Sequence, residues 1–119
     1  VAFTASQKVY ADPLLNSLET AQVKFPLRLY REHCTSLGGS YVKDLHLLGR
    51  DLNKIAIVDN SPVCYTFQQR NAIPIVSWFS DRGDRELPQL ADSLLRTLSS
   101  VESVYPVLDA FNSMMATGL

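Results

Sequence analysis

Short apolar runs alternate with helical patterns along the chain, and this alternation predicts the fold class. Val1–Phe3 and Ile55–Val58 are apolar runs that predict buried strands, and the period-two pattern over 27–31 predicts a strand with one buried face. The stretch "NAIPIVSWF" predicts another strand, and Pro74 places it at a sheet edge because proline has no N–H to donate. Strands that alternate with helical segments indicate an α/β fold with a mainly parallel sheet.

Helical segments are expected on both sides of these strands. Residues 7–11 predict the beginning of a helix, after which Asp12 is expected as a cap and Pro13 as the first residue before "LLNSLE". Near the C-terminus the leucines of 87–98 fit one helical face, and Pro88 is acceptable there only in the first turn.

The middle and the end of the chain predict shorter elements. "TSLGGS" has the composition of a turn, and apolar residues at 42, 45 and 48 predict a helical turn that Gly49 closes. Asp51 is expected to cap a last turn before the second apolar run. A final helix is expected over roughly Val101–Met115.

Length and composition indicate one globular domain over 1–119. The chain has 119 residues, of which 46% are hydrophobic and 19% charged. A net charge of −1 and a pI near 6.1 give no electrostatic reason to expect direct binding to nucleic acid or to a membrane. Cys34 and Cys64 stand thirty positions apart without a second pair, so free thiols are expected and zinc is not.

Polar residues gather where the predicted strands end. Thr4 and Ser6 follow the first strand, and Lys43 lies in "YVKDL". Asp59 and Asn60 follow the second apolar run. Sites in an open parallel sheet form at the carboxyl ends of its strands. Each of these residues also has an ordinary structural explanation, as a turn residue, a cap or a solvated side chain.

The order of five motifs adds to this interpretation. "FTAS", "RLYREHCT", "YVKDLHLLGRDL", "IVDNSP" and "NAIPIVSWFSD" follow one another as in the phosphatases that act on the carboxy-terminal domain of RNA polymerase II, and the chain resembles these proteins from Val1 to about Leu98. They belong to the haloacid dehalogenase superfamily. The resemblance implies a three-layer, Rossmann-like α/β fold, of which this chain is the C-terminal part.

The resemblance also implies an activity and a set of site residues. Such enzymes are protein phosphoserine/threonine phosphatases that form an aspartyl-phosphate and use Mg²⁺. Asn60 matches the direct metal ligand, and Asp59 matches the neighbouring acid that orients a metal-bound water or the lysine. Thr4 matches the residue whose hydroxyl holds phosphate oxygens, and Lys43 matches the cation placed against phosphate and nucleophile.

Two further residues match positions that contact the peptide substrate. They are Arg31 and Tyr10, for which an exposed strand arginine and a helix tyrosine with its ring in the core are the structural alternatives. The implied partners are a phosphorylated protein, with the polymerase tail as one example, and a regulatory protein. Gln7 stands where relatives that grip a proline of the tail have an apolar residue, which weakens the case for that substrate. By resemblance, the location is the nucleus or the nuclear envelope and endoplasmic reticulum.

Other polar residues are left outside the predicted chemistry. Asp44, Asp81 and Asp84 are interpreted as local caps or loop residues, because each lies in or beside a predicted turn. The two histidines, His33 and His46, do not have the spacing of metal ligands.

The sequence contains no D-x-D, although a D-x-D-x-T/V stretch on the first central strand supplies the nucleophile and the acid/base in the family. We expect that segment before Val1, so that the strands on either side of it expose their edges here.

Three interpretations of the missing motif remain open. One is a fragment of an active phosphatase. A second is a catalytically inactive relative that binds phosphopeptides or a partner. A third, ranked last because "DNSP" is present, is the presequence-binding module of a mitochondrial import receptor. In each case we expect no turnover by this chain alone.

Overall fold

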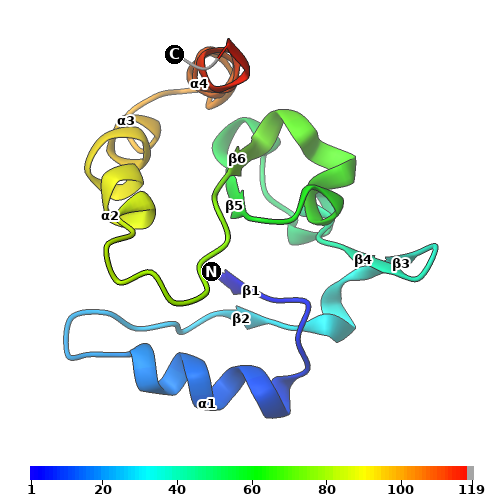
Figure 1. Ribbon diagram of the computed structural model, residues 1–119. Helices are drawn as coiled ribbons and strands as arrows, with labels where there is room; N and C mark the ends of the chain where they lie inside the picture. The colour runs from blue at the N-terminus through cyan, green and yellow to red at the C-terminus, as the bar shows by residue number, and fades with distance from the viewer. Residues whose placement is uncertain (118–119) are drawn as a thin grey trace.

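The computed structural model describes residues 1–117, and the strands in this range form three two-stranded sheets (Figure 1). Two of these sheets are parallel and the third is an antiparallel hairpin. The pairs are β1 (Ala2–Phe3) with β2 (Arg28–Leu29), β3 (Thr35–Leu37) with β4 (Ser40–Val42), and β5 (Ile57–Asp59) with β6 (Ala72–Pro74). The mixed α/β class is thus confirmed, while two separate two-stranded parallel sheets stand in place of the single parallel sheet that was expected.

Helices and helical turns connect the strands and cover them. None of the helices within 1–117 is long and apolar enough to cross a membrane. They are α1 (Lys8–Leu18), η1 (Arg31–His33), η2 (Leu45–Leu48), η3 (Leu52–Lys54), η4 (Pro62–Asn71), α2 (Glu86–Leu90), the π turn η5 (Ala91–Leu95), α3 (Arg96–Leu98) and α4 (Tyr105–Thr117).

The prediction of a helix boundary at Asp12 and Pro13 is wrong, because α1 runs through both residues. The carboxylate of Asp12 lies 2.8 Å from the ammonium group of Lys8, one turn earlier in α1. It also accepts a hydrogen bond from Arg28 of β2 at 3.0 Å and another from the hydroxyl of Tyr30, which follows β2. These contacts offset the backbone hydrogen bond that a proline inside a helix removes. Asp12 therefore holds α1 against β2.

Predictions for the middle of the chain are partly right. Val42 lies in β4 and not in a helical turn, because "TSLGGS" forms most of a hairpin whose turn is Gly38 and Gly39, both at positive φ. The helical turn after it is η2, which ends at Gly49 with φ 67° as expected. The elements β5 and α4 begin two and four residues later than predicted.

The sheet formed by β5 and β6 is covered on both faces. Ile57 and Ala72 pack with Leu45 and Tyr65, which come from η2 and η4. The neighbouring residue Ile73 packs on the opposite face with three side chains of the C-terminal helical region, Leu98, Val104 and Leu108. Alternation of side chains along the strands produces these two layers of core.

A groove separates the two parallel sheets. Within 1–117, β1 pairs with β2 and β5 pairs with β6, and no strand joins β1 to β5. We call the recess between them the β1–β5 groove; its volume is about 380 Å³, and Val1 and Phe3 line one wall while Ile55–Asp59 line the other. In Figure 1, β5 lies above β1.

Candidate functional site

A buried ion pair lies at the carboxyl end of β5. Lys43 directly follows β4, and its ammonium group lies 2.5 Å from Oδ2 of Asp59, the last residue of β5. Only 8% of Lys43 and 6% of Asp59 is exposed. The other carboxylate oxygen accepts a hydrogen bond from the backbone N–H of Ser61 at 2.9 Å. Asp59 thus fixes the position of a cation that also lies 5.8 Å from the ring centroid of Phe3.

Asn60 is the exposed neighbour of this pair. Its side-chain nitrogen donates a hydrogen bond to the hydroxyl of Ser77 at 2.8 Å, which leaves the amide oxygen available to a ligand. Ser77 was not predicted as a site residue. Its position three residues after β6, at the same sheet edge as Asn60, is the sequence signal that would have indicated it.

Thr4 and Arg31 lie together at the end of β1. The hydroxyl of Thr4 accepts a hydrogen bond from the N–H of Ser6 at 3.0 Å, as in an ordinary turn, and its hydrogen remains able to donate. Arg31 donates from Nε to the carbonyl oxygen of Ala5 at 2.8 Å, and its guanidinium carbon lies 4.9 Å from the ring centroid of Tyr41. Arg31 is exposed but belongs to η1, so its interpretation as a strand residue is wrong.

Tyr10 stands apart from these residues. It lies on α1 with 72% of its surface exposed, so the alternative that places its ring in the core is wrong. Within the described part of the chain, no hydrogen bond or ring contact joins its side chain to Lys43, Asp59 or Thr4. The structure therefore brings Lys43, Asp59 and Asn60 together, sets Thr4 and Arg31 at the neighbouring strand end, and leaves Tyr10 on the helix surface.

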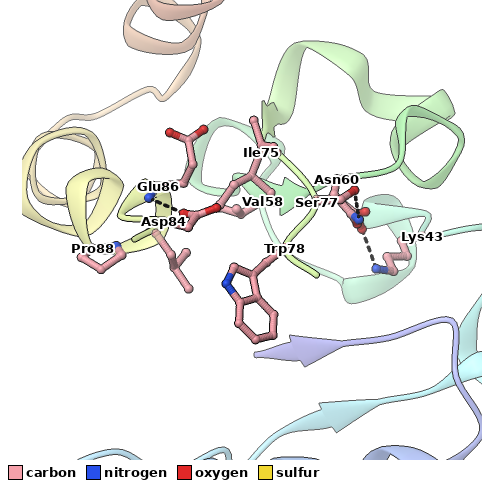
Figure 2. A pocket seen from close by; sticks show the side chains of 12 residues that line it. Lys43, Val58, Asn60, Ile75, Ser77, Trp78, Asp84, Glu86 and Pro88 are labelled. Atoms are coloured by element: carbon pink, nitrogen blue, oxygen red, sulfur yellow. Dashed lines mark hydrogen bonds and ion pairs between the residues drawn. The ribbon is translucent and has the colours of Figure 1, made fainter. Parts of the chain in front are cut away.

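A second recess begins at the same ion pair. It has a volume of about 560 Å³, and we call it the Trp78 groove after the indole on its wall (Figure 2). Its lining comes from four parts of the chain: Lys43; Val58, Asp59 and Asn60; Ile75, Val76, Ser77 and Trp78; and Asp84, Glu86, Leu87 and Pro88.

Comparison with known proteins identifies the family. The model of NLI interacting factor-like phosphatases matches residues 1–105, which is most of the chain. This chain belongs to the NLI interacting factor-like phosphatase family. The match confirms the resemblance drawn from the five motifs.

Several relatives of this phosphatase-family chain are about half identical to it. They are a probable C-terminal domain small phosphatase of Dictyostelium discoideum, 55% identical over 92% of the chain and 35% of the relative; phosphatase Herzog of Drosophila melanogaster, 53% identical over 91% and 30%; and the human carboxy-terminal domain RNA polymerase II polypeptide A small phosphatase 2, 49% identical over 91% and 39%. The chain thus spans about a third of the length of these relatives.

Residues 1–117 of this phosphatase-family chain do not complete a magnesium site on their own. Mg²⁺ requires an octahedral set of oxygen ligands, usually including one or two carboxylates. One oxygen of Asp59 contacts Lys43 and the other accepts the N–H of Ser61, and the amide oxygen of Asn60 lies beside them. Among residues 1–117 there is also no group of three or more His, Cys, Asp or Glu side chains placed to hold a metal.

Two cysteines lie near the site. Cys34 lies beside the end of β1, with its sulfur 4.0 Å from the carbonyl oxygen of Thr4. Burial raises the pKa of the Cys34 thiol, so the thiol stays protonated near neutral pH. Cys64 is buried, and both cysteines are free, as expected.

Proposed function

We propose that this chain is part of a Mg²⁺-dependent protein phosphoserine/threonine phosphatase of the haloacid dehalogenase type, whose nucleophilic aspartate lies on an upstream segment. The observation that carries the proposal is the buried Lys43–Asp59 pair, which presents a cation at the carboxyl ends of two parallel strands that do not pair with each other. Membership in a phosphatase family supports the same reaction class.

The backbone of the β1–β5 groove is suited to one more parallel strand. Ala2 and Thr4 donate to the carbonyl oxygens of β2 and its preceding residue, so the N–H and C=O of Phe3 point to the opposite edge. The carbonyl of Asp59 accepts from Ile75, so the corresponding groups of Val58 also point away from β6. A strand between them would pair with both edges and give the order β2-β1-new strand-β5-β6.

Such a strand would bring acidic residues beside Lys43. An aspartate at its carboxyl end would attack phosphorus and displace the serine or threonine oxygen, and water would then release phosphate from the aspartyl-phosphate. The ammonium group of Lys43 offsets the negative charges of carboxylate and phosphate as they approach, and Asp59 holds that group in place. The hydroxyl of Thr4 would donate to a phosphate oxygen.

Magnesium belongs to this proposal only together with the upstream carboxylates. Asn60 would contribute its amide oxygen to an ion whose other protein ligands come from that segment, and the ion would neutralise phosphate charge. Ser77 would orient Asn60 through the hydrogen bond that it accepts.

The proposed substrate is a phosphorylated protein. The human relative is named as a phosphatase of the carboxy-terminal domain of RNA polymerase II. We propose that domain as one candidate substrate of this chain. Because Gln7 is polar and exposed, we propose other phosphoproteins as candidate substrates in addition to the polymerase domain. Arg31 is the residue best placed to contact the peptide, since it lies against the loop that follows Thr4. A nuclear location and a regulatory partner protein are part of the same proposal.

A binding function is the second candidate. It is favoured by the absence of D-x-D from the 119 residues and by the incomplete set of metal ligands. In that case Lys43 and Thr4 would hold a phosphopeptide without turning it over.

Phosphate release from a phosphoserine peptide, measured on the full-length product of the gene, tests the proposal. The natural transcript, sequenced through the codon of Val1, defines that product. We expect Mg²⁺-dependent release that falls roughly a hundredfold or more in Lys43→Ala and in Asn60→Ala, as for loss of other charge-stabilising groups. Asp92→Asn is the control, since the Asp92 side chain is 85% exposed and, among residues 1–117, its one ion pair is with Arg96. Unchanged rates in both site variants would refute these roles, and binding without release would favour the second candidate.

A further inference from the structure

The Trp78 groove extends away from the Lys43–Asp59 pair, and the proposed chemistry uses only one end of it. At that end lie the Lys43–Asp59 ion pair and the amide of Asn60. A volume of about 560 Å³ is far larger than a phosphate group needs. The remaining space is open to the residues that flank a phosphorylated side chain.

The far end of the groove is acidic. Asp84 and Glu86 are half-buried there, and Figure 2 shows them on the opposite side of the groove from Lys43 and Asn60. Neither carboxylate forms an ion pair with another residue in 1–117. A partly desolvated carboxylate that forms no ion pair favours a ligand that carries a positive charge.

The middle of the groove is apolar and aromatic. Leu87 and Pro88 line it together with Val58 and Ile75 of the adjoining strand ends. The indole of Trp78 is 62% exposed, and its N–H donates to the carbonyl oxygen of Asp81 at 2.6 Å. An exposed ring held in this way offers its surface to an apolar side chain, and its face also attracts cations.

We propose that the Trp78 groove binds the part of the substrate next to the phosphorylated residue, and that it selects an apolar side chain against Trp78 together with a lysine or arginine against Asp84 and Glu86. The two carboxylates at the far end carry this inference, because they favour a cation there while the phosphate lies beside Lys43 at the other end. The inference rests on the proposed function, which places the phosphate beside Lys43.

The fluorescence of Trp78 reports occupancy of the groove without turnover, because it is the only tryptophan in the chain. The chain is titrated with two tryptophan-free phosphoserine peptides that carry leucine beside the phosphoserine. In one peptide, the positions two and three residues before and after the phosphoserine are arginine, and in the other peptide the same positions are glutamate. We expect both peptides to change the Trp78 emission and the arginine peptide to bind at least about fivefold more tightly, the effect of one partly exposed charge pair.

The double variant Asp84→Asn/Glu86→Gln removes both charges and keeps the size of each side chain. The amide oxygen of Asn at position 84 can still accept the N–H of residue 86, which Asp84 accepts now at 2.8 Å. We expect this variant to lose the preference for arginine, and Asp92→Asn to keep it. Equal affinity for both peptides, an unchanged emission, or a preference that survives in the double variant would overturn the proposal.

A second pair of variants tests the aromatic contact by anisotropy of a labelled arginine peptide. Trp78→Ala should weaken binding about tenfold, as for loss of an aromatic contact. Phe79→Ala is the matched control, because Phe79 is 85% exposed and does not line the groove. Equal effects of the two variants would contradict the assignment.

Hydrolysis by the full-length product separates the two proposals. If it releases phosphate from both peptides at equal kcat/KM, the selectivity of the groove is refuted and the phosphatase function stands. If the chain prefers the arginine peptide but the full-length product hydrolyses neither, the groove assignment stands and the phosphatase function is refuted.

Discussion

The ammonium group of Lys43 and the carboxylate of Asp59 depend on each other. Both are almost fully buried, and each is the closest opposite charge of the other. A buried ion pair contributes little net stability compared with apolar residues, but removal of one partner leaves an uncompensated charge. Removal of one partner therefore costs more stability than replacement of both partners by uncharged residues.

Lys43→Met tests this dependence. We expect it to lower the free energy of unfolding by about 3 kcal/mol or more, because the Asp59 carboxylate then keeps only the N–H of Ser61. The double variant Lys43→Met/Asp59→Asn should recover part of that loss, since Asn keeps an acceptor without the charge. Urea denaturation of both variants measures the difference. Additive losses from the two substitutions would contradict the account.

The prediction that Lys43 and Asp59 belong to one site came from the resemblance to the phosphatases and not from hydrophobic periodicity. They are sixteen positions apart, and Lys43 was placed in a helical turn although it follows a strand. The contact between Asn60 and Ser77 and the charged ends of the Trp78 groove depend on how distant loops pack. Asp84 was accordingly interpreted only as a loop or cap residue; it lies just before Arg85, the N-cap of α2, and accepts the N–H of Glu86.

The helix α1 shows how tertiary contacts override a local signal. Asp12 and Pro13 have the chemistry of a helix start, yet Asp12 lies inside α1 and contacts Lys8, Arg28 and Tyr30. The hydrogen bond from Lys8, followed by that from Tyr30, lowers the pKa of Asp12 from 3.8 to about 2. The carboxylate thus stays charged in the folded protein at a pH where the unfolded chain already takes up a proton.

Acid stability should report this contact. Between pH 3.8 and about 2 the unfolded chain binds more protons at Asp12 than the folded protein, so the contribution of Asp12 is complete above this window and is lost as the pH falls through it. We expect Asp12→Asn to be less stable than the parent at neutral pH and to lose less stability across that window. Thermal unfolding at several pH values measures this, with the exposed Asp92→Asn as control. Parallel curves for Asp12→Asn and the parent would contradict the assignment.

Among the other elements, the long apolar patterns were the most reliable. The strand at the second apolar run and the edge position of Pro74 agree with the structure. Of the predicted leucine face, Leu90, Leu94, Leu95 and Leu98 pack on the core, whereas Leu87 is exposed. Strand β4 was missed because three residues are too few to show alternation, and the spacing of Val42 from Leu45 and Leu48 also fits a helix.

As a whole, the molecule has two parts that meet at the β1–β5 groove. Both faces of β5 and β6 are packed, whereas the edges of β1 and β5 that face the groove have no partner strand within 1–117. Open strand edges favour the addition of another strand. The open edges of these strands were expected because the sequence contains no D-x-D, whereas the groove itself shows in no local pattern, since the two strands are more than fifty residues apart.

Amide hydrogen exchange tests the open edges. We expect the amides of Phe3 and Val58 to exchange quickly in the chain alone and more slowly, by about tenfold or more, when a strand occupies the groove. The amides of Thr4 and Ile75 are the controls, since they already donate to Leu29 and Asp59. Slow exchange of Phe3 and Val58 in the chain alone would show that these edges are not open.

The most direct test of the central claim is hydrolysis of para-nitrophenyl phosphate by the purified chain with Mg²⁺, in the absence and presence of a synthetic strand peptide that ends in D-x-D-x-T. We predict no release by the chain alone, release when the peptide is added, and none with a peptide whose aspartates are replaced by asparagine. Release by the chain alone that is lost in Asp59→Ala would contradict the claim, because the catalytic nucleophile would then lie within these 119 residues.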